Sequence, residues 1–422
     1  MSPSKPSAHS DIRGAARLAV DATAGLIDLV EALHQRVASA PGATAADGRT
    51  RGITGLVYRS VRGVTQLVGG SVDALLGLIE PALRPGGPAP LPSPAREALA
   101  AALNGVLGDH LAARHNPLAI AMQWRVDGQA LPLDAAALRA RLPEARGTLI
   151  LALHGLCMND LQWRREGHDH AAALAVGLDG TAVYLHYNSG LAIADNGRLL
   201  AAQMAPLLAA WPVPVQRVVL LTHSLGGLVA RSALHQGAAA GQTWVAQVDD
   251  LVFLGTPHGG APLERAGHGL DVILDHTPYA APLARVGRVR SAGITDLRHG
   301  HCLARPQPCP LPSPAHTRCW AIAAQLGAFE GPAKGRLLGA MLGDGLVPLA
   351  SALGQHPDPA RALAFLPGHS AVFADTSHMQ LLSSPAVAAQ LLQWLNAGTG
   401  SGTLATSRLT PPPPAPNPSP LP

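Results

Sequence analysis

The sequence predicts an α/β fold, in which helices cover both faces of a mostly parallel central sheet. From about residue 116 onward, short apolar runs rich in β-branched residues alternate with longer segments of helix-forming residues. Such alternation is typical of parallel sheets whose strands are joined by helices. The chain has 422 residues, of which 47% are hydrophobic and 14% are charged. It is therefore large and apolar enough for one large or two ordinary globular domains.

The elements of this fold follow one another in a regular order. A hairpin comes first, because strand-forming residues flank an Asp127-Gly128 turn. The strands expected after it are 148–154, 182–187, 217–223, 250–256, 318–324 and 362–367. Helical segments are expected between several of them, at 169–178, 196–211 and 225–236. Ligands of such sheets bind at the carboxyl ends of the strands, so the candidate site is expected at that edge.

The ends of the chain differ in composition from its middle. Residues 1–12 and 399–422 are polar or proline-rich and are expected to be disordered tails. Residues 13–112 are expected to form an N-terminal helical region, because apolar residues recur there at spacings of three and four. A proline-rich linker near 84–95 interrupts this region, and Pro94 is expected to open its last helix.

The α/β domain is expected to span 116–398. Within it, the stretch 262–316 is too long for an ordinary connection and is rich in Gly, Pro and His. A long connection inside a compact domain is usually functional. We therefore expect a lid or cap insertion at 262–316, over the site.

Charge and hydropathy exclude several classes of partner. The net charge of +4 and the aromatic content of 3% leave few residues for phosphate binding or base stacking, so we expect no nucleic acid partner. Asp21 and Asp28 interrupt the apolar N-terminal stretch, which argues against a signal peptide. No segment indicates a membrane-spanning helix. These features predict a cytoplasmic protein, with peripheral membrane attachment as the alternative.

The four cysteines are expected to be free thiols: Cys157, Cys302, Cys309 and Cys319. If the protein is exported by another route, a disulfide between Cys302 and Cys309 is the alternative. A metal site that combines these two with His299 and His301 is not expected, because the C-x₂-C spacing of zinc sites is absent. No metal or other cofactor is therefore predicted.

Ser224 lies in the stretch LLTHSLGGLVARS, between the strand 217–223 and the helix that follows it. Gly226 and Gly227 would let the backbone turn sharply and the helix pack closely against the strand. This arrangement is typical of a nucleophile elbow, which exposes a serine hydroxyl at the carboxyl end of a central strand. Thr222 occupies the place of the first glycine in the G-x-S-x-G pattern. The alternative is a strand–turn–helix corner in which the serine has no chemical role.

A serine needs a histidine base and a carboxylate that holds the base in one tautomer. Asp344 lies in MLGDGLVPLAS after the strand 318–324, and His378 lies in DTSHMQLL before the last helix. The order Ser, Asp, His is the one expected for this fold. Asp375 and His369 are the alternatives, but Asp375 is only three residues before His378 and His369 does not directly precede the last helix.

Two backbone amides are expected to form an oxyanion hole. One is the amide of Leu225, directly after the serine, and the other is that of Leu156 in LHGLCMND. Gly155 would let this loop bend, and His154 would support it. His258, in FLGTPHGGAP, is expected at the rim of the site in a supporting role.

These segments together resemble the serine lipases and esterases of the α/β-hydrolase fold. The segments are LHGL, THSLGGLVAR, LGTPHGGAP, GDGLVP and SHMQLL, and they lie within about residues 145–397. The resemblance is to the branch that contains bacterial triacylglycerol lipases, GPI-inositol deacylases and lecithin–cholesterol acyltransferases. GTPHGG after the elbow is specific to this branch. Thr222 departs from its pattern, and the resemblance explains neither the region 13–112 nor the insertion 262–316.

The resemblance implies hydrolysis of carboxylic esters without a cofactor, on a small-molecule substrate that is an apolar or lipid-like ester. It implies a Ser224–His378–Asp344 triad with an acyl-enzyme intermediate, and an oxyanion hole formed by the amides of Leu156 and Leu225. Acyl transfer or thioester cleavage on the same triad is an alternative, because the sequence does not identify the acceptor. It also does not indicate the acyl-chain length or the oligomeric state.

A membrane-surface or partner-binding protein with weak catalysis is the alternative of another class. Four arginines accompany the N-terminal apolar stripe, as they do in interfacial helices: Arg49, Arg51, Arg59 and Arg62. The simpler interpretation is that this stripe packs on the hydrolase domain.

Overall fold

The structure is a computed structural model that describes residues 94–261, 291–305, 309–311, 316–327 and 343–397. The predicted tails, most of the region 13–112 and its linker, and residues 262–290 of the predicted insertion lie outside the described residues.

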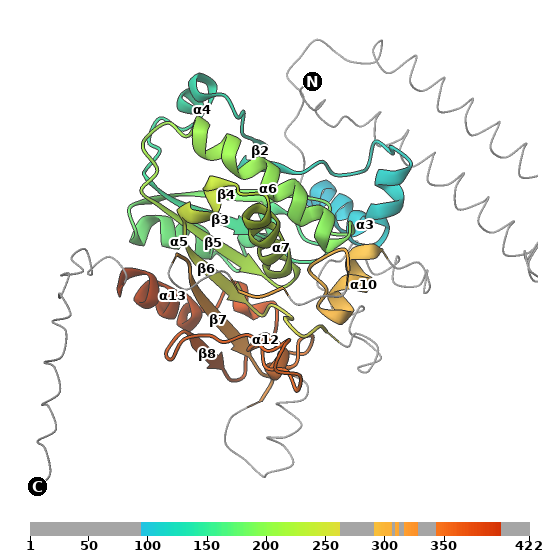
Figure 1. The fold of residues 1–422 in the computed structure, drawn as a ribbon. Helices are drawn as coiled ribbons and strands as arrows, with labels where there is room; N and C mark the ends of the chain where they lie inside the picture. The colour runs from blue at the N-terminus through green and yellow to red at the C-terminus, as the bar shows by residue number, and fades with distance from the viewer. Residues whose placement is uncertain (1–93, 262–290, 306–308, 312–315, 328–342, 398–422) are drawn as a thin grey trace, which may run out of the picture.

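Eight strands form one sheet in the order β2-β1-β4-β3-β5-β6-β7-β8 (Figure 1). The pairs from β4 to β8 are all parallel, and β1 pairs antiparallel with both β2 and β4. The strands are β1 Gln123–Val126, β2 Gln129–Ala130, β3 Thr148–Leu153, β4 Gly180–His186, β5 Arg217–His223, β6 Val248–Leu254, β7 Arg318–Ala324 and β8 Ser370–Phe373. The predicted α/β fold with a mostly parallel sheet is therefore confirmed.

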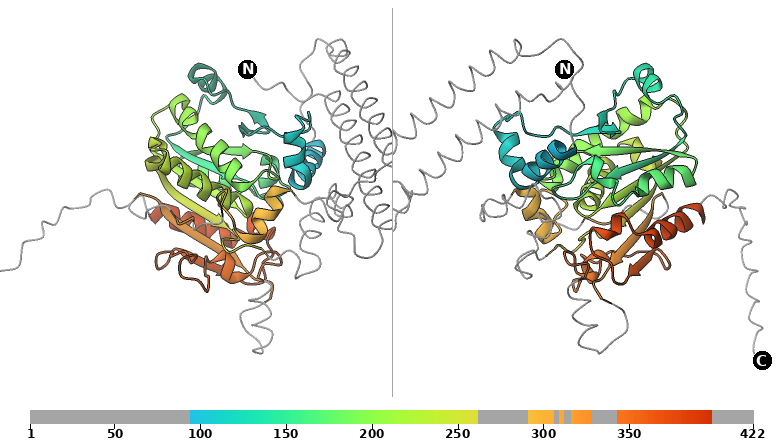
Figure 2. Two further views of the ribbon diagram at one scale, coloured as in Figure 1. Left: turned by 45° about the vertical axis from the view of Figure 1, so that its right-hand side comes forward. Right: turned by 180° about the vertical axis from the view of Figure 1, so that it is seen from behind.

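Helices cover both faces of this sheet (Figures 1 and 2). Side chains of α6 and α7 belong to the apolar core on one face, and those of α5 and α13 belong to the core on the other. The α-helices are α3 Pro94–Ala113, α4 Ala135–Arg141, α5 His170–Gly177, α6 Ile193–Ala210, α7 Leu225–Ala239, α10 Ala292–His299, α12 Leu349–Ala352 and α13 Pro385–Ala397. The described residues also include three short 3₁₀ helices: Asp160–Trp163, Thr243–Gln247 and Gln380–Leu382.

β3 shows why these strands are continuous apolar runs. Leu149, Leu151 and Leu153 face the core that contains α6 and α7, whereas Ile150 and Ala152 face the core that contains α5 and α13. Successive side chains of a strand point to opposite faces, and here both faces are covered. A central strand such as β3 therefore needs apolar residues at successive positions, without alternating polar ones.

The predicted hairpin is present. β1 and β2 are joined by Asp127 and Gly128, whose φ angles are 52° and 71°. Two successive residues with positive φ are typical of the type I′ turn, which favours Asp-Gly.

The last predicted strand is wrong. Residues 362–366 have no regular structure, and the edge strand is β8 at Ser370–Phe373. The amide of Leu363 donates to the carbonyl of Gly354 and so does not pair with the sheet. Residues 361–366 all line a cavity, and the alternation of Leu363 and Phe365 with alanines resembles the pattern of a strand.

α3 and α10 lie side by side at one end of the domain (Figure 2). α3 is the described part of the region 13–112, and it begins at Pro94 as predicted. The hydroxyl of Ser291 donates to the carbonyl of Gly105 at 2.7 Å, and the amide of Ala292 donates to Asp109 at 2.8 Å. The described part of the predicted insertion is therefore anchored to the N-terminal helix.

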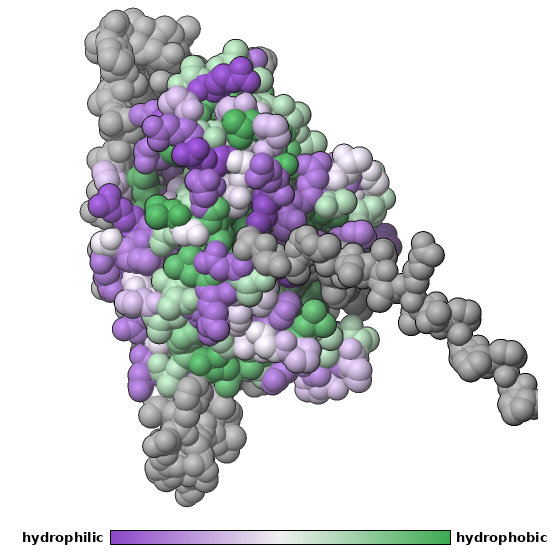
Figure 3. Space-filling view, turned by 90° about the vertical axis from the view of Figure 1, so that its left-hand side faces the viewer, coloured by the Kyte–Doolittle hydropathy of each residue, from purple (hydrophilic) through white to green (hydrophobic). Residues whose placement is uncertain are grey.

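The face of the molecule shown in Figure 3 mixes hydrophilic and hydrophobic residues. Val176 on α5 is 86% exposed, while its neighbours Leu174 and Ala171 are buried. Among the helices that the structure describes, none combines the length and hydropathy needed to cross a membrane.

All four cysteines are described, buried and free. Cys302 and Cys309 form no disulfide in this structure, and the thiol of Cys302 donates to the carbonyl of Gly300 at 3.9 Å. The predicted free thiols are therefore confirmed for this structure.

Candidate active site

Ser224 occupies a strained turn between β5 and α7. Its φ and ψ angles are 54° and −124°, a combination that non-glycine residues rarely adopt. Its amide donates to the carbonyl of Leu254 at 2.9 Å, which ties the turn to the end of β6. Strain of this kind costs on the order of 1–3 kcal/mol and persists at sites where a function requires the geometry.

Thr222 and Gly226 show how the surrounding backbone accommodates this turn. The hydroxyl of Thr222 is buried and donates to the carbonyl of Val252 at 2.7 Å, so a threonine fits where the usual pattern has glycine. A Cβ on Gly226 would lie 2.5 Å from the carbonyl oxygen of Leu153. Glycine is therefore required for α7 to begin this close to the end of β3.

His378 and Asp344 lie together, 34 residues apart in the sequence. Nδ1 of His378 lies 2.7 Å from Oδ2 of Asp344, and both side chains are buried. The other oxygen of Asp344 accepts from the amides of Leu346 at 3.0 Å and Val347 at 2.8 Å. A carboxylate only accepts, so Nδ1 carries the proton and Nε2 is left as the basic nitrogen.

The alternative residues are placed elsewhere. His369 stacks on Trp320 with ring centroids 3.8 Å apart, and its Nδ1 lies 3.2 Å from the carbonyl oxygen of Cys319. Asp375 is exposed, and its amide donates to the carbonyl of Gly327 at 3.4 Å. Neither residue has a hydrogen bond or ion pair with His378 among the described contacts. The structure thus brings together Asp344 and His378, and not the alternatives.

His378 and Ser224 both lie at the carboxyl end of β6. The Ser224 amide is bonded to Leu254, and a Cβ on the next residue, Gly255, would lie 3.0 Å from Nδ1 of His378. The ring of His223, the residue before the serine, packs 4.6 Å from the ring of His378. Its Nε2 lies 3.2 Å from the His378 carbonyl oxygen.

His223 is a site residue that the sequence analysis missed. Burial is the first cause that lowers its pKa well below the usual value, and the neighbouring His378 lowers it further. His223 is therefore neutral and supports the backbone of the histidine loop through the bond to the His378 carbonyl. Its place directly before Ser224 was the signal available in the sequence.

The loop after β3 approaches Ser224. A Cβ on Gly155 would lie 3.1 Å from the Cβ of Ser224, and Leu156 beside it is buried. Leu225 is the first residue of α7. Its amide therefore has no acceptor within its own helix. The two residues predicted to supply oxyanion donors thus lie on the two segments that flank the serine.

His154 packs beneath this loop. Burial lowers its pKa to about 3, so it is neutral. The Tyr187 amide donates to its Nε2 at 3.4 Å, and its Nδ1 can then donate to the Gly155 carbonyl at 2.9 Å. The hydroxyl of Tyr187 also donates to the His154 carbonyl at 2.7 Å, which fixes the backbone before Gly155.

His258 lies apart from these groups. Its Nδ1 lies 3.2 Å from Nη1 of Arg231, and its ring contacts Phe253 edge-on at 4.6 Å. Both His258 and Arg231 line a cavity of about 600 Å³. Ser224 and His378 are not among the described residues that line this cavity.

A second buried cluster joins α3 to the sheet: Glu97, Arg125, Asp160 and His186. The carboxylates and the histidine are close enough together to hold a metal ion. However, Nη1 of Arg125 lies 2.8 Å from Glu97 and 3.2 Å from Asp160, so the guanidinium already supplies the positive charge there. The cluster therefore fits an ion-pair network and does not fit a metal site.

Comparisons with known proteins agree with this architecture. The profile of the family described as "PGAP1-like alpha/beta domain" matches residues 186–286, about a quarter of the chain. No curated protein matches the sequence.

Several solved structures are similar over somewhat more than half of the chain. The mature lipase BlEst2 of Bacillus licheniformis is 23% identical, with a TM-score of 0.40, and the alignment covers 58% of this chain and 90% of that one. Phospholipase PlaB of Legionella pneumophila is 13% identical, with a TM-score of 0.41 and coverage of 59% of both chains. The thioesterase RedJ of Streptomyces coelicolor is 14% identical, with a TM-score of 0.35 and coverage of 60% and 87%. At these values no activity or substrate transfers to this chain.

The strand order, the helices on both faces and the strained serine turn after β5 agree with the match of residues 186–286. This mostly parallel α/β domain therefore contains a segment, residues 186–286, that is similar to the PGAP1-like family.

Proposed function

We propose that the protein is a serine hydrolase that cleaves carboxylic esters with apolar or lipid-like groups. The observation that carries the proposal is the 2.7 Å contact between His378 Nδ1 and Asp344 Oδ2, at the same sheet edge as the strained Ser224. This contact fixes the tautomer that a general base requires. The resemblance of the sequence to lipases and esterases and the PGAP1-like match of residues 186–286 support an ester substrate with an apolar part.

In this mechanism Nε2 of His378 takes the proton of the Ser224 hydroxyl as the serine oxygen attacks the ester carbonyl. The amides of Leu225 and Leu156 stabilise the negative charge that develops on the carbonyl oxygen. His378 then gives its proton to the leaving alcohol, and an acyl-enzyme remains on Ser224. Water deprotonated by His378 attacks this intermediate and releases the carboxylic acid. Asp344 stabilises the charged form of His378 both when the acyl-enzyme forms and when it is hydrolysed.

The test is hydrolysis of p-nitrophenyl esters from C2 to C16 by the wild type and Ser224→Ala. We expect the variant to lose at least about 10⁴-fold in kcat/KM, since the members of a triad act as one unit. Ser370→Ala is the matched control, because Ser370 is an exposed serine on β8. A Ser224→Ala protein that retains wild-type hydrolysis would contradict the proposal. A thioester of the preferred chain length, measured in parallel, separates esterase from thioesterase activity.

A further inference from the structure

The cavity beside α7 contains a buried positive charge. Arg231 lies two turns after Ser224 on α7 and is 4% exposed. Its Nη1 donates to Nδ1 of His258, and its Nη2 donates to the carbonyl of Cys309. It forms no ion pair with a carboxylate among the residues that the structure describes. A buried charge without a counter-charge is costly, so this arrangement favours an anion nearby.

Two unpaired polar groups of Arg231 and His258 are donors. Because arginine can only donate, Nδ1 of His258 must be the acceptor, and the proton of the neutral ring is on Nε2. That Nε2–H and the Nε–H of Arg231 are buried without a partner. Acceptor oxygens, such as those of a carboxylate, are the groups that complement such donors.

The charges of the described lining residues sum to one. Burial lowers the pKa of His301, and burial and Arg231 lower that of His258, so both rings are neutral at pH 7. Asp358 and Arg361 are exposed lining residues with opposite charges. The uncompensated charge is therefore that of Arg231, which matches a monoanion.

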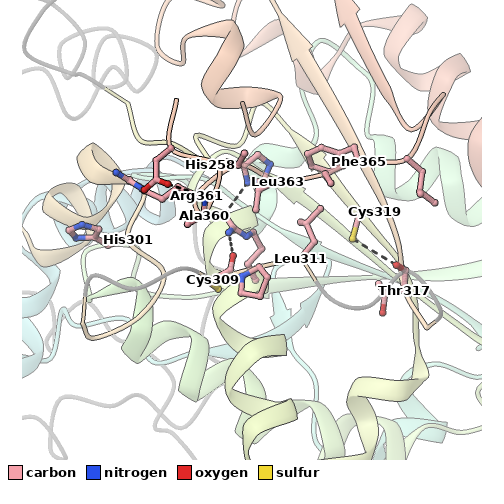
Figure 4. A pocket seen from close by; sticks show the side chains of 17 residues that line it. His258, His301, Cys309, Leu311, Thr317, Cys319, Ala360, Arg361, Leu363 and Phe365 are labelled. Carbon is pink, nitrogen blue, oxygen red and sulfur yellow. Dashed lines mark hydrogen bonds between the residues drawn. The ribbon is translucent and has the colours of Figure 1, made fainter. Parts of the chain in front are cut away.

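The walls of the cavity are largely apolar. Figure 4 shows His258, Leu363 and Phe365 on one side, and Cys309 and Leu311 on the other. The volume of about 600 Å³ lies within the ~300–1,000 Å³ that is typical of small-molecule sites. The space therefore suits an unbranched apolar chain next to a single positive charge.

We propose that this cavity is a second, non-catalytic site that binds an amphipathic monoanion, namely a carboxylate on an apolar chain. Arg231 offsets the charge of the carboxylate, and the side chains of Leu311, Leu363 and Phe365 contact the chain. The site is separate from Ser224, and the proposal does not depend on ester hydrolysis.

The test is titration calorimetry of the full chain with dodecanoate and with dodecanol, which lacks the charge. We expect one dodecanoate per cavity and at least tenfold weaker binding of dodecanol. Leu363→Trp, which fills the cavity, and Arg231→Gln should each weaken dodecanoate binding at least tenfold. Arg198→Gln is the control, because Arg198 is an exposed arginine on α6 paired with Asp195. Circular dichroism and thermal unfolding identify a variant that does not fold, in which case the other variant decides.

A fluorophosphonate that modifies Ser224 distinguishes this site from the active site. We expect the modified protein to bind dodecanoate as tightly as the unmodified protein. Loss of binding on modification would place dodecanoate at Ser224 and overturn the proposal. If no modification occurs, the proposed hydrolase function fails, and Leu363→Trp still tests the cavity.

A thiolate of Cys302 is the alternative to a bound carboxylate as the counter-charge of Arg231. Its pKa is lowered to about 7, first by the hydrogen bond from Cys309, and also by Arg231. If a Cys302 thiolate neutralises Arg231, the wild type will not bind dodecanoate and Cys302→Ser will. That result would overturn the proposal, whereas equal binding by both proteins would support it.

Discussion

His378 and His258 are both buried histidines that follow strands of the same sheet, but they face opposite charges. Nδ1 of His378 lies 2.7 Å from the carboxylate of Asp344, whereas Nδ1 of His258 lies 3.2 Å from the guanidinium of Arg231. The carboxylate fixes a proton on Nδ1 and leaves Nε2 basic. The guanidinium of Arg231 requires an unprotonated Nδ1 on His258 and leaves its Nε2 as a donor. The partner of Nδ1 therefore separates a histidine suited to proton transfer from one suited to anion binding.

Replacing each histidine with glutamine should give the largest difference in activity between the two positions. We expect His378→Gln to lower kcat/KM on a p-nitrophenyl ester by at least about 10⁴-fold, because the base is lost. His258→Gln should remain within about threefold of the wild type, since the ring has no contact with the triad among the described residues. Equal losses in both variants would show that the partner of Nδ1 does not distinguish the two histidines.

Asp344→Asn tests the role of the carboxylate. We expect a loss of about 10⁴-fold in kcat, because an amide does not hold His378 in the required tautomer. Asp375→Asn is the matched control and should change kcat by less than about threefold, because that carboxylate is exposed. If Asp375→Asn were the more damaging change, the assignment of the acid would be wrong.

Acid pH tests the buried neutral histidines. Burial lowers the pKa of His154 to about 3 and that of His170 to about 4. In the unfolded chain both have the usual value of about 6.5, so the unfolded state binds more protons below that pH. We expect the contribution of these two histidines to the free energy of unfolding to be constant above pH 7 and to fall between pH 6.5 and 4, by up to about 1.4 kcal/mol per pH unit for each histidine.

Urea unfolding at intervals between pH 7.5 and 4.5 measures this slope. His170→Gln removes one titrating group, so the slope should fall by about one proton. The glutamine amide can still donate to the Leu381 carbonyl that His170 faces, which preserves the local contact. A variant whose slope equals that of the wild type would show that His170 does not contribute to the pH dependence.

Thr222→Gly has the smallest expected effect on activity. Glycine restores the usual elbow pattern, so we expect kcat/KM to stay within about threefold. The variant loses the hydrogen bond to Val252 and gains backbone freedom, and we expect the free energy of unfolding to fall by about 1–2 kcal/mol. A gain in rate above tenfold would show that Thr222 restrains the site.

The sequence was sufficient to predict which residues lie together at one edge of the sheet; their roles remain a proposal. Ser224, Asp344 and His378 each follow a strand, and the carboxyl ends of parallel strands meet at one edge. The error at 362–367 has a physical cause, since this segment lies along a cavity and the amide of Leu363 donates to Gly354 and not to a strand of the sheet.

Contacts that join distant segments could not be predicted from local pattern. Arg231 and His258 are 27 residues apart, and Arg125 and Glu97 are 28 apart, so only the tertiary fold brings each pair together. Local pattern indicated that the helix after Ser224 packs closely. It did not indicate which neighbour each side chain of that helix would meet.

The most direct test of the central claim is intact-mass and peptide analysis after reaction with a fluorophosphonate. We expect a single adduct on Ser224 in the wild type and in His258→Gln. Ser224→Ala should form no adduct, and Asp344→Asn should react at least about 100-fold more slowly. An unmodified wild type, or an adduct on another serine, would contradict the assignment of Ser224 as the nucleophile.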